Sequence, residues 1–174
     1  MTAIPSGYRN IIDPLIATAR DILERGEPLQ HMVFVGNLTT GETAIVPIDT
    51  RSEEAKDASA DLLRRLAASR QADFVFSIMD SWGLPPNKMS QMDEILERYG
   101  SIGASPYRVD IVALLLETRY GMWVAQMPVK PKGPSKRKRT FGVPEFKHYH
   151  GAQGRFADLL PEKIAPDAPG GVLH

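Results

Sequence analysis

The chain has 174 residues, of which 43% are hydrophobic and 24% are charged, and these values are typical of a soluble globular protein with one domain. It contains no cysteine, which excludes disulfides and thiolate chemistry and favours a cytoplasmic protein. The net charge is zero, and no apolar run reaches the roughly 18 residues that a membrane-spanning helix needs, so we expect no contact with a membrane.

The first predicted element is a helix that begins at Asp13-Pro14, after a loose stretch over residues 1–10. Aspartate is a favourable N-cap, and proline fits the first helical position because its missing N–H has no intrahelical partner there. Apolar residues recur at helical spacing up to Leu23, and Gly26 then ends the helix.

Two short strands, 31–36 and 43–48, are predicted to form a hairpin, with Pro47 at an edge because it has no N–H to donate. A helix is predicted over residues 53–70 and a third strand over 72–82. Since a helix separates the second strand from the third, a right-handed crossover that makes this pair parallel is possible.

The helix over residues 53–70 has two expected details. Thr50 and Glu53 have the spacing of a capping box, with Thr50 as the N-cap. The face directed at the core is expected to carry Ala55, Ala58, Leu62, Leu66 and either Ala67 or Ser69.

The most hydrophobic run, residues 109–129, reads as two strands that meet at Tyr120-Gly121, since glycine takes the positive φ of a tight turn at little cost. This turn would place Arg119 opposite Met122. One face of the hairpin is apolar throughout and is the expected core: Val112, Leu114, Leu116, Trp123, Ala125 and Met127. The other face is half apolar and ends in Glu117, Arg119 and Gln126.

Together these elements predict an α+β fold with a mainly antiparallel sheet of about five strands, two main helices and a short third helix over residues 87–99. Residues 1–160 are expected to form one domain, with a basic loop over 130–140. Residues 161–174, rich in proline, glycine and alanine, are expected to be a disordered tail.

Several segments resemble a family of small uncharacterised α+β proteins of bacteria and their phages. They are HMVFVGN with ETAIVPID, EEAKDASADLLRRLAA, ADFVFSIMDSWGL, VDIVALLLETRYGMWVAQMPV and GRFADLLP, and they span roughly residues 29–161. Such proteins often carry Glu-Ala-Trp where this chain has Asp80-Ser81-Trp82. The resemblance implies the fold and a mobile-element context, and no established activity.

Three carboxylates stand at the ends of predicted strands: Asp49, Asp80 and Glu117. Carboxylates that meet at strand ends bind divalent metals and support phosphoester hydrolysis. The alternative, typical of strand ends, is solvated turn formers. A metal-dependent hydrolase or nuclease is therefore one of two hypotheses, and it requires the three groups to converge on one ion.

Histidines offer a second possible metal site. His148 and His150 are alternate residues that would point the same way on a strand, and with His31 they would ligate zinc. Without cysteine partners the pattern is weak, and surface histidines beside an aromatic residue are the simpler interpretation. We therefore expect no metal and no cofactor.

A basic segment, residues 130–139, holds six of the 21 lysines and arginines, so the rest of the chain has 15 basic and 21 acidic residues. Clustered cations bind nucleic acid by releasing condensed counterions, and aromatic residues nearby (Phe141, Phe146 and Tyr149) could stack on bases. A solvated loop and an acidic protein partner are the alternatives. The candidate binding residues are Lys130, Lys132, Lys136, Arg137, Lys138 and Arg139, with Arg119 at the polar end of the central hairpin.

The sequence contains no catalytic motif, which favours an interaction protein over an enzyme. Its partner is expected to be a protein or a nucleic acid, bound through the basic segment. A monomer and a homodimer are both open, because the half-apolar face of the central hairpin could pack on a second copy.

Overall fold

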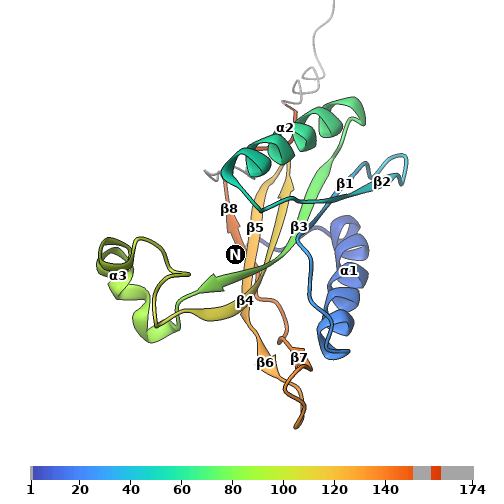
Figure 1. The fold of residues 1–174 in the computed structure, drawn as a ribbon. Coiled ribbons are helices and arrows are strands. Elements are labelled where there is room, and N and C mark those ends of the chain that lie inside the picture. The colour runs from blue at the N-terminus through green and yellow to red at the C-terminus, as the bar shows by residue number, and fades with distance from the viewer. Residues whose placement is uncertain (1, 151–157, 162–174) are drawn as a thin grey trace, which may run out of the picture.

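The computed structural model describes residues 2–150 and 158–161. An antiparallel sheet of six strands in the order β2-β1-β3-β4-β5-β8 carries the fold, so the predicted α+β class is confirmed with one strand more than expected (Figure 1). These strands are β1 (Met32–Gly36), β2 (Thr43–Pro47), β3 (Phe74–Gly83), β4 (Val109–Thr118), β5 (Gly121–Pro128) and β8 (Lys147–Tyr149). A two-stranded ribbon consists of β6 (Lys130–Pro131) and β7 (Arg139–Thr140).

Helix α1 (Ser6–Glu24) packs on one face of the sheet and forms the larger core with it. The helix buries Tyr8, Ile12, Ile16, Ala19 and Leu23. They meet the strand residues predicted to face the core, which are Phe74, Phe76 and Ile78 of β3 together with Val112, Leu114, Leu116, Trp123, Ala125 and Met127 of the central hairpin.

The predicted start of this helix is wrong. It begins at Ser6 rather than at Asp13, and Pro14 lies inside it. Pro14 has no N–H to donate to the Asn10 carbonyl, four residues earlier in the helix. Both residues are exposed, so water can bond that carbonyl, which reduces the cost of a proline inside the helix. Burial of Tyr8 and Ile12 stabilises the first two turns, which local capping rules do not detect. The predicted end is confirmed, because Gly26 has a φ of +83° directly after the C-cap.

Helix α2 (Glu53–Ser69) covers the opposite face of the sheet at one end and forms a second core there (Figure 1). The N-cap is Ser52 and not Thr50, since the Ser52 hydroxyl accepts the Ala55 N–H at 3.0 Å. The buried stripe is Ala60, Leu63 and Ala67, with Leu66 packed beside it. The expected face was therefore right at Leu66 and Ala67 but wrong at Leu62, which is 47% exposed.

Strands β2 and β3 do not pair. Strand β1 lies between them and is antiparallel to both, so the parallel pair considered from the sequence is absent from the described sheet. Helix α2 therefore carries the chain past β1.

The central hairpin has a different register from the expected one. Thr118 lies opposite Gly121, so Arg119 and Tyr120 are the two turn residues. The Thr118 hydroxyl orders the turn by accepting the Tyr120 N–H at 3.0 Å. Relative to the prediction the partner strand slides by two residues, and a shift of two leaves every side chain on its predicted face.

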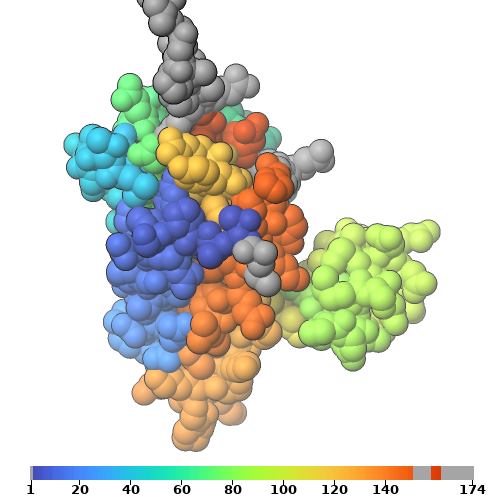
Figure 2. Space-filling model, turned by 180° about the vertical axis from the view of Figure 1, so that it is seen from behind, coloured from blue at the N-terminus to red at the C-terminus, as the bar shows by residue number. Residues whose placement is uncertain are grey.

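Between β3 and β4 the chain forms a separate lobe, which contains the 3-10 helix η1 (Pro86–Gln91) and helix α3 (Met92–Tyr99). Seen from the α1 side, the lobe projects from the body (Figure 2).

Among the described residues, no helix is both long and apolar enough to cross a membrane.

Candidate functional site

The basic segment is a loop over residues 132–138 whose base is a pair of two-residue strands, which the sequence did not predict; residues 130–140 together are called the ribbon. Lys130 pairs with Thr140 and Pro131 with Arg139. The Lys132 N–H donates to the Lys138 carbonyl at 2.9 Å, which extends the pairing toward the tip. The ribbon continues from β5 and extends beyond the end of the large sheet (Figure 1).

The base of the ribbon is attached to α1. The Glu24 carboxylate accepts hydrogen bonds from Lys132 Nζ at 2.7 Å and from the Thr140 hydroxyl at 2.9 Å. The Lys132 bond is the main reason that the pKa of Glu24 is lowered. Arg20 donates to the Phe141 carbonyl at 3.2 Å and lies over the Phe141 ring at 4.6 Å. These contacts fix the direction in which the ribbon points.

Two of the ribbon's six cations are already paired, Lys132 with Glu24 and Arg139 with Asp110 at 3.7 Å. The other four have exposed side chains and form no ion pair with any residue that the structure describes: Lys130, Lys136, Arg137 and Lys138. The ribbon therefore presents a concentrated positive charge.

Two hollows of about 470 Å³ each border the ribbon. One is lined by four of the cations, Lys130, Lys136, Lys138 and Arg139, and by the carboxylate of Asp110, which pairs with Arg139. The second lies between the ribbon and the end of α1, and is lined by Gly26, Glu27, Pro28, Lys136, Arg137 and Arg139. Ammonium and guanidinium groups that converge on a hollow are suited to phosphate oxygens, which accept several charge-assisted hydrogen bonds.

Arg119, the seventh predicted binding residue, is not part of this site. It lies in the turn before β5, whereas the ribbon follows the other end of that strand. Eight residues of β5 separate the two, which is about 26 Å. The Arg119 guanidinium donates to the Tyr120 hydroxyl and lies over the Tyr120 ring at 4.8 Å.

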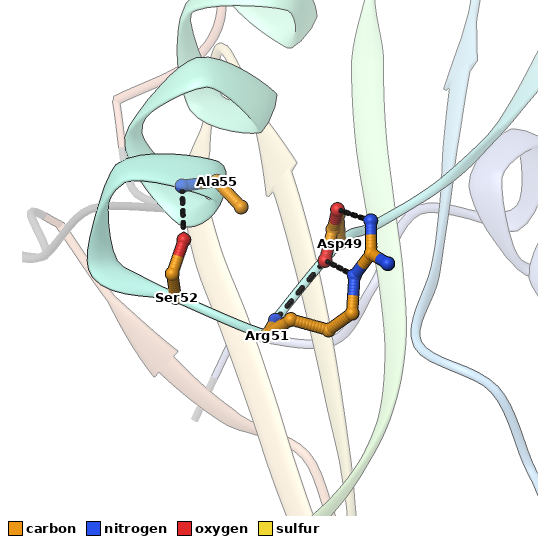
Figure 3. Close-up of polar contacts among 4 residues, drawn as sticks. All are labelled: Asp49, Arg51, Ser52 and Ala55. Carbon is orange, nitrogen blue, oxygen red and sulfur yellow. Dashed lines mark hydrogen bonds and ion pairs between the residues drawn. The ribbon is translucent and has the colours of Figure 1, made fainter.

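The carboxylate at position 49 forms a local pair (Figure 3). Asp49 accepts hydrogen bonds from the Arg51 side chain at 2.7 and 3.0 Å and from the Arg51 N–H at 3.0 Å. The Arg51 hydrogen bonds lower the pKa of Asp49 from 3.8 to about 2. This turn precedes the Ser52 cap of α2, so the residue orders a helix start.

The other two carboxylates lie far apart. Glu117 is next to Val75 on β3, five residues from Asp80, which is about 16 Å along the strand. The two also point to opposite faces, because side chains alternate along a strand. The structure therefore does not bring Asp49, Asp80 and Glu117 to one metal ion, and no group of metal ligands is present among the described residues.

Glu117 has a structural contact instead. Its carboxylate accepts the Leu159 N–H at 3.0 Å and the Leu160 N–H at 3.3 Å, and Leu159 is buried in the α2 core. Burial raises the pKa of Glu117. Of the predicted tail, residues 161–174, all but residue 161 lie outside the described residues.

His148 and His150 are neighbours, with ring centroids 4.8 Å apart, but they form no zinc site with His31. His148 Nε2 is 2.8 Å from the Tyr120 carbonyl, and its ring lies 4.4 Å from that of Trp123. His31 lines a separate cavity beside β3.

Burial lowers the pKa of His31 from 6.5 to about 4. Between these pH values the unfolded chain binds a proton that the folded protein does not, so stability rises with pH from about 4 to 6.5. After allowance for partial solvent exposure we expect a change on the order of 1–2 kcal/mol. Urea unfolding at several pH values should show this slope in the wild type and in His150→Gln, but not in His31→Gln. An unchanged slope in His31→Gln would contradict the assignment.

This cavity, which has a volume of about 780 Å³ and lies beside the last residues of β3, was not predicted from the sequence. The lengths of the predicted strands indicated that one strand would be left partly unpaired. The strand over 72–82 is longer than its neighbour over 31–36, and a longer strand must extend past a shorter partner.

Comparisons of this chain with protein-family models, with curated proteins and with solved structures found no match. The similarity to small bacterial and phage proteins stays a prediction. The geometry of the described residues is therefore the basis for assigning a function.

Proposed function

We propose that this protein binds double-stranded nucleic acid through the phosphate backbone, using the ribbon formed by β6 and β7. The observation that carries the proposal is the convergence of Lys130, Lys136, Lys138 and Arg139 on one hollow. Since nucleic acid is an intracellular ligand, the proposal accords with the cytoplasmic location expected from the sequence.

The aromatic residues near the ribbon support a duplex over a single strand. Binding of single strands generally relies on exposed rings on which bases stack. Phe141 is 3% exposed and Phe146 is packed against the α1 core, so neither is free for stacking. Tyr149 is exposed but lies opposite Met122 at the start of β5, whereas the ribbon follows the other end of that strand. Contacts with phosphates alone need no such rings.

The ribbon also has a suitable form, because the major groove of DNA admits a two-stranded β-ribbon. Its side chains are lysines and arginines, which are typical phosphate contacts, and the described ribbon has no asparagine or glutamine for reading adenine. We therefore expect no preference for adenine; guanine is the base that these lysines and arginines can contact.

The test is a fluorescence anisotropy titration of a short DNA duplex at several salt concentrations. With four to six phosphate contacts, log Kobs should fall with log salt with a slope of roughly −4 to −5. Replacement of Lys130, Lys136, Arg137 and Lys138 by alanine should weaken binding by at least about 100-fold at low salt and flatten the slope by roughly 3 to 4.

The matched control changes the net charge equally but leaves the ribbon intact: Arg65→Ala, Arg98→Ala, Arg119→Ala and Lys147→Ala, all of them exposed. It should retain the wild-type slope. Equal loss in both variants would mean that total charge decides binding, and salt-independent binding by the wild type would also overturn the proposal.

A further inference from the structure

Strand β3 extends beyond its neighbour. Pairing with β1 ends where Met32 lies opposite Ile78, but β3 continues to Gly83. Over these last residues β3 pairs only with β4, from Met79 opposite Ala113 to Gly83 opposite Val109. The edge that would face β1 is therefore open.

The backbone groups that point into this opening follow from the hydrogen-bond alternation. The Ile48 N–H donates to the His31 carbonyl at 3.0 Å, so residues 31, 33 and 35 turn their backbone groups toward β2. Residues 32, 34 and 36 then face β3, and their partners are Phe74, Phe76 and Ile78. Backbone groups alternate in direction along β3, so those of residues 80 and 82 point the same way as those of residues 74, 76 and 78. The N–H and C=O groups of Asp80 and Trp82 therefore point into the opening.

The other side of the sheet gives the same result. The Val129 N–H donates to the Asp110 carbonyl at 2.9 Å, so the even-numbered residues of β4 face β5. The odd-numbered residues of β4 then face β3, where they meet Met79 and Ser81. The backbone N–H and C=O groups of Asp80 and Trp82, which point away from β4, are left without a strand partner among the described residues.

The 780 Å³ cavity lies along this edge. Its walls are Leu29, Gln30 and His31 before β1, Pro47, Ile48 and Thr50 at the end of β2, and Lys56 of α2. Its floor is Met79, Asp80, Ser81 and Trp82. The open edge is therefore recessed, which disfavours pairing between two copies of the chain, because each copy's edge would have to enter the other's cavity.

The side chains at the edge indicate what would fit. Asp80 forms no ion pair with a described residue, and desolvation raises its pKa. Trp82 is 53% exposed although its ring is held against Gly103, where a Cβ would lie 2.5 Å from the ring, and the Arg108 guanidinium already lies over that ring at 5.2 Å. The Asp80 carboxylate is therefore the group that is suited to a lysine or arginine. On the other face, Met79 and Ile48 are suited to an apolar side chain.

We propose that this edge binds an extended peptide of another protein as an additional antiparallel strand, with a basic residue of the peptide opposite Asp80. When a peptide adds a strand to a sheet, main-chain hydrogen bonds supply the affinity, and every second side chain of the peptide supplies the specificity. In an antiparallel pair, the residues opposite Asp80 and Trp82 point their N–H groups at β3. In a peptide that alternates valine with lysine, the two lysines would lie opposite Asp80 and Trp82, because a basic residue is proposed to lie opposite Asp80.

The test uses a fluorescein-labelled peptide, Thr-Val-Lys-Val-Lys-Val-Thr, and the unaltered protein. N-methylation of the two lysine residues removes the donors that face β3 and should weaken binding at least about tenfold. N-methylation of the flanking valines should change Kd less than about twofold, since those N–H groups face solvent. The two peptides carry the same charge, so general electrostatic attraction cannot separate them.

Asp80→Asn should weaken binding of the lysine peptide about fivefold and leave binding of a threonine-for-lysine peptide unchanged. Backbone amides of Asp80 and Trp82 should become protected from hydrogen exchange on binding. Equal weakening by both N-methylated peptides, or no binding of the lysine peptide at millimolar concentration, would overturn the proposal.

Discussion

Replacing Trp123 with alanine should destabilise the protein by about 3–5 kcal/mol, the range for truncating a large buried aromatic side chain. Trp123 is 1% exposed, and it belongs to the core formed with α1 although its strand, β5, is next to the edge strand β8. Its indole N–H also donates to the Thr2 carbonyl at 2.9 Å, which holds the start of the chain against β5. Denaturant unfolding followed by circular dichroism measures the loss.

Trp123→Phe is the matched control, because it retains most of the buried area and removes the hydrogen bond. Since Thr2 is exposed, water can replace the lost donor, and the cost of that bond should be about 1 kcal/mol. If Trp123→Phe were as damaging as Trp123→Ala, the hydrogen bond rather than the packing would hold this end of the sheet.

Replacing Gly121 with alanine should cost about 3 kcal/mol and loosen β8. Gly121 has a φ of +116°, which strains any residue with a Cβ. An added Cβ would also lie 2.6 Å from the Tyr149 carbonyl oxygen and 2.6 Å from His148 Nε2. Hydrogen exchange should therefore accelerate at the amides of Met122 and Val124, which pair with β8.

Gly41→Ala separates the two reasons for the expected loss of stability, which are the positive φ and the close contact with β8. Gly41 has a φ of +73°, but no atom lies within 4 Å of its Cβ position. This control should cost only about 1 kcal/mol and leave exchange in β5 unchanged. Equal effects of the two variants would mean that the close approach of β8 does not constrain Gly121.

Hydrophobic pattern predicted much of this fold. The apolar run over residues 109–129 and Gly121 identified the hairpin, and the fixed alternation of side chains along a strand identified its core face, which α1 covers. The same pattern left the register open. Glycine at 121 indicated a turn, whereas its role is to admit β8, a strand that no local pattern revealed.

Helix existence was likewise predictable, but helix boundaries and faces were not. Helix α2 has apolar residues on more than one stripe, and contact with Val33, Val35 and Val75 selects the stripe through Leu63. Helix α1 extends back to Ser6 because Tyr8 and Ile12 find a core to pack against. These choices depend on neighbours that are distant in the sequence.

The candidate site divides in the same way. The concentration of positive charge in residues 130–139 can be read from the order of the residues, because the charge of a segment is the sum of its own side chains. Three other features follow from the fold: Glu24 and Asp110 pair with two of the six cations, Asp80 and Glu117 point to opposite faces of the sheet, and β3 extends past β1. Pairing and register are set by contacts between segments far apart in the chain, and these contacts exist only once the sheet has formed.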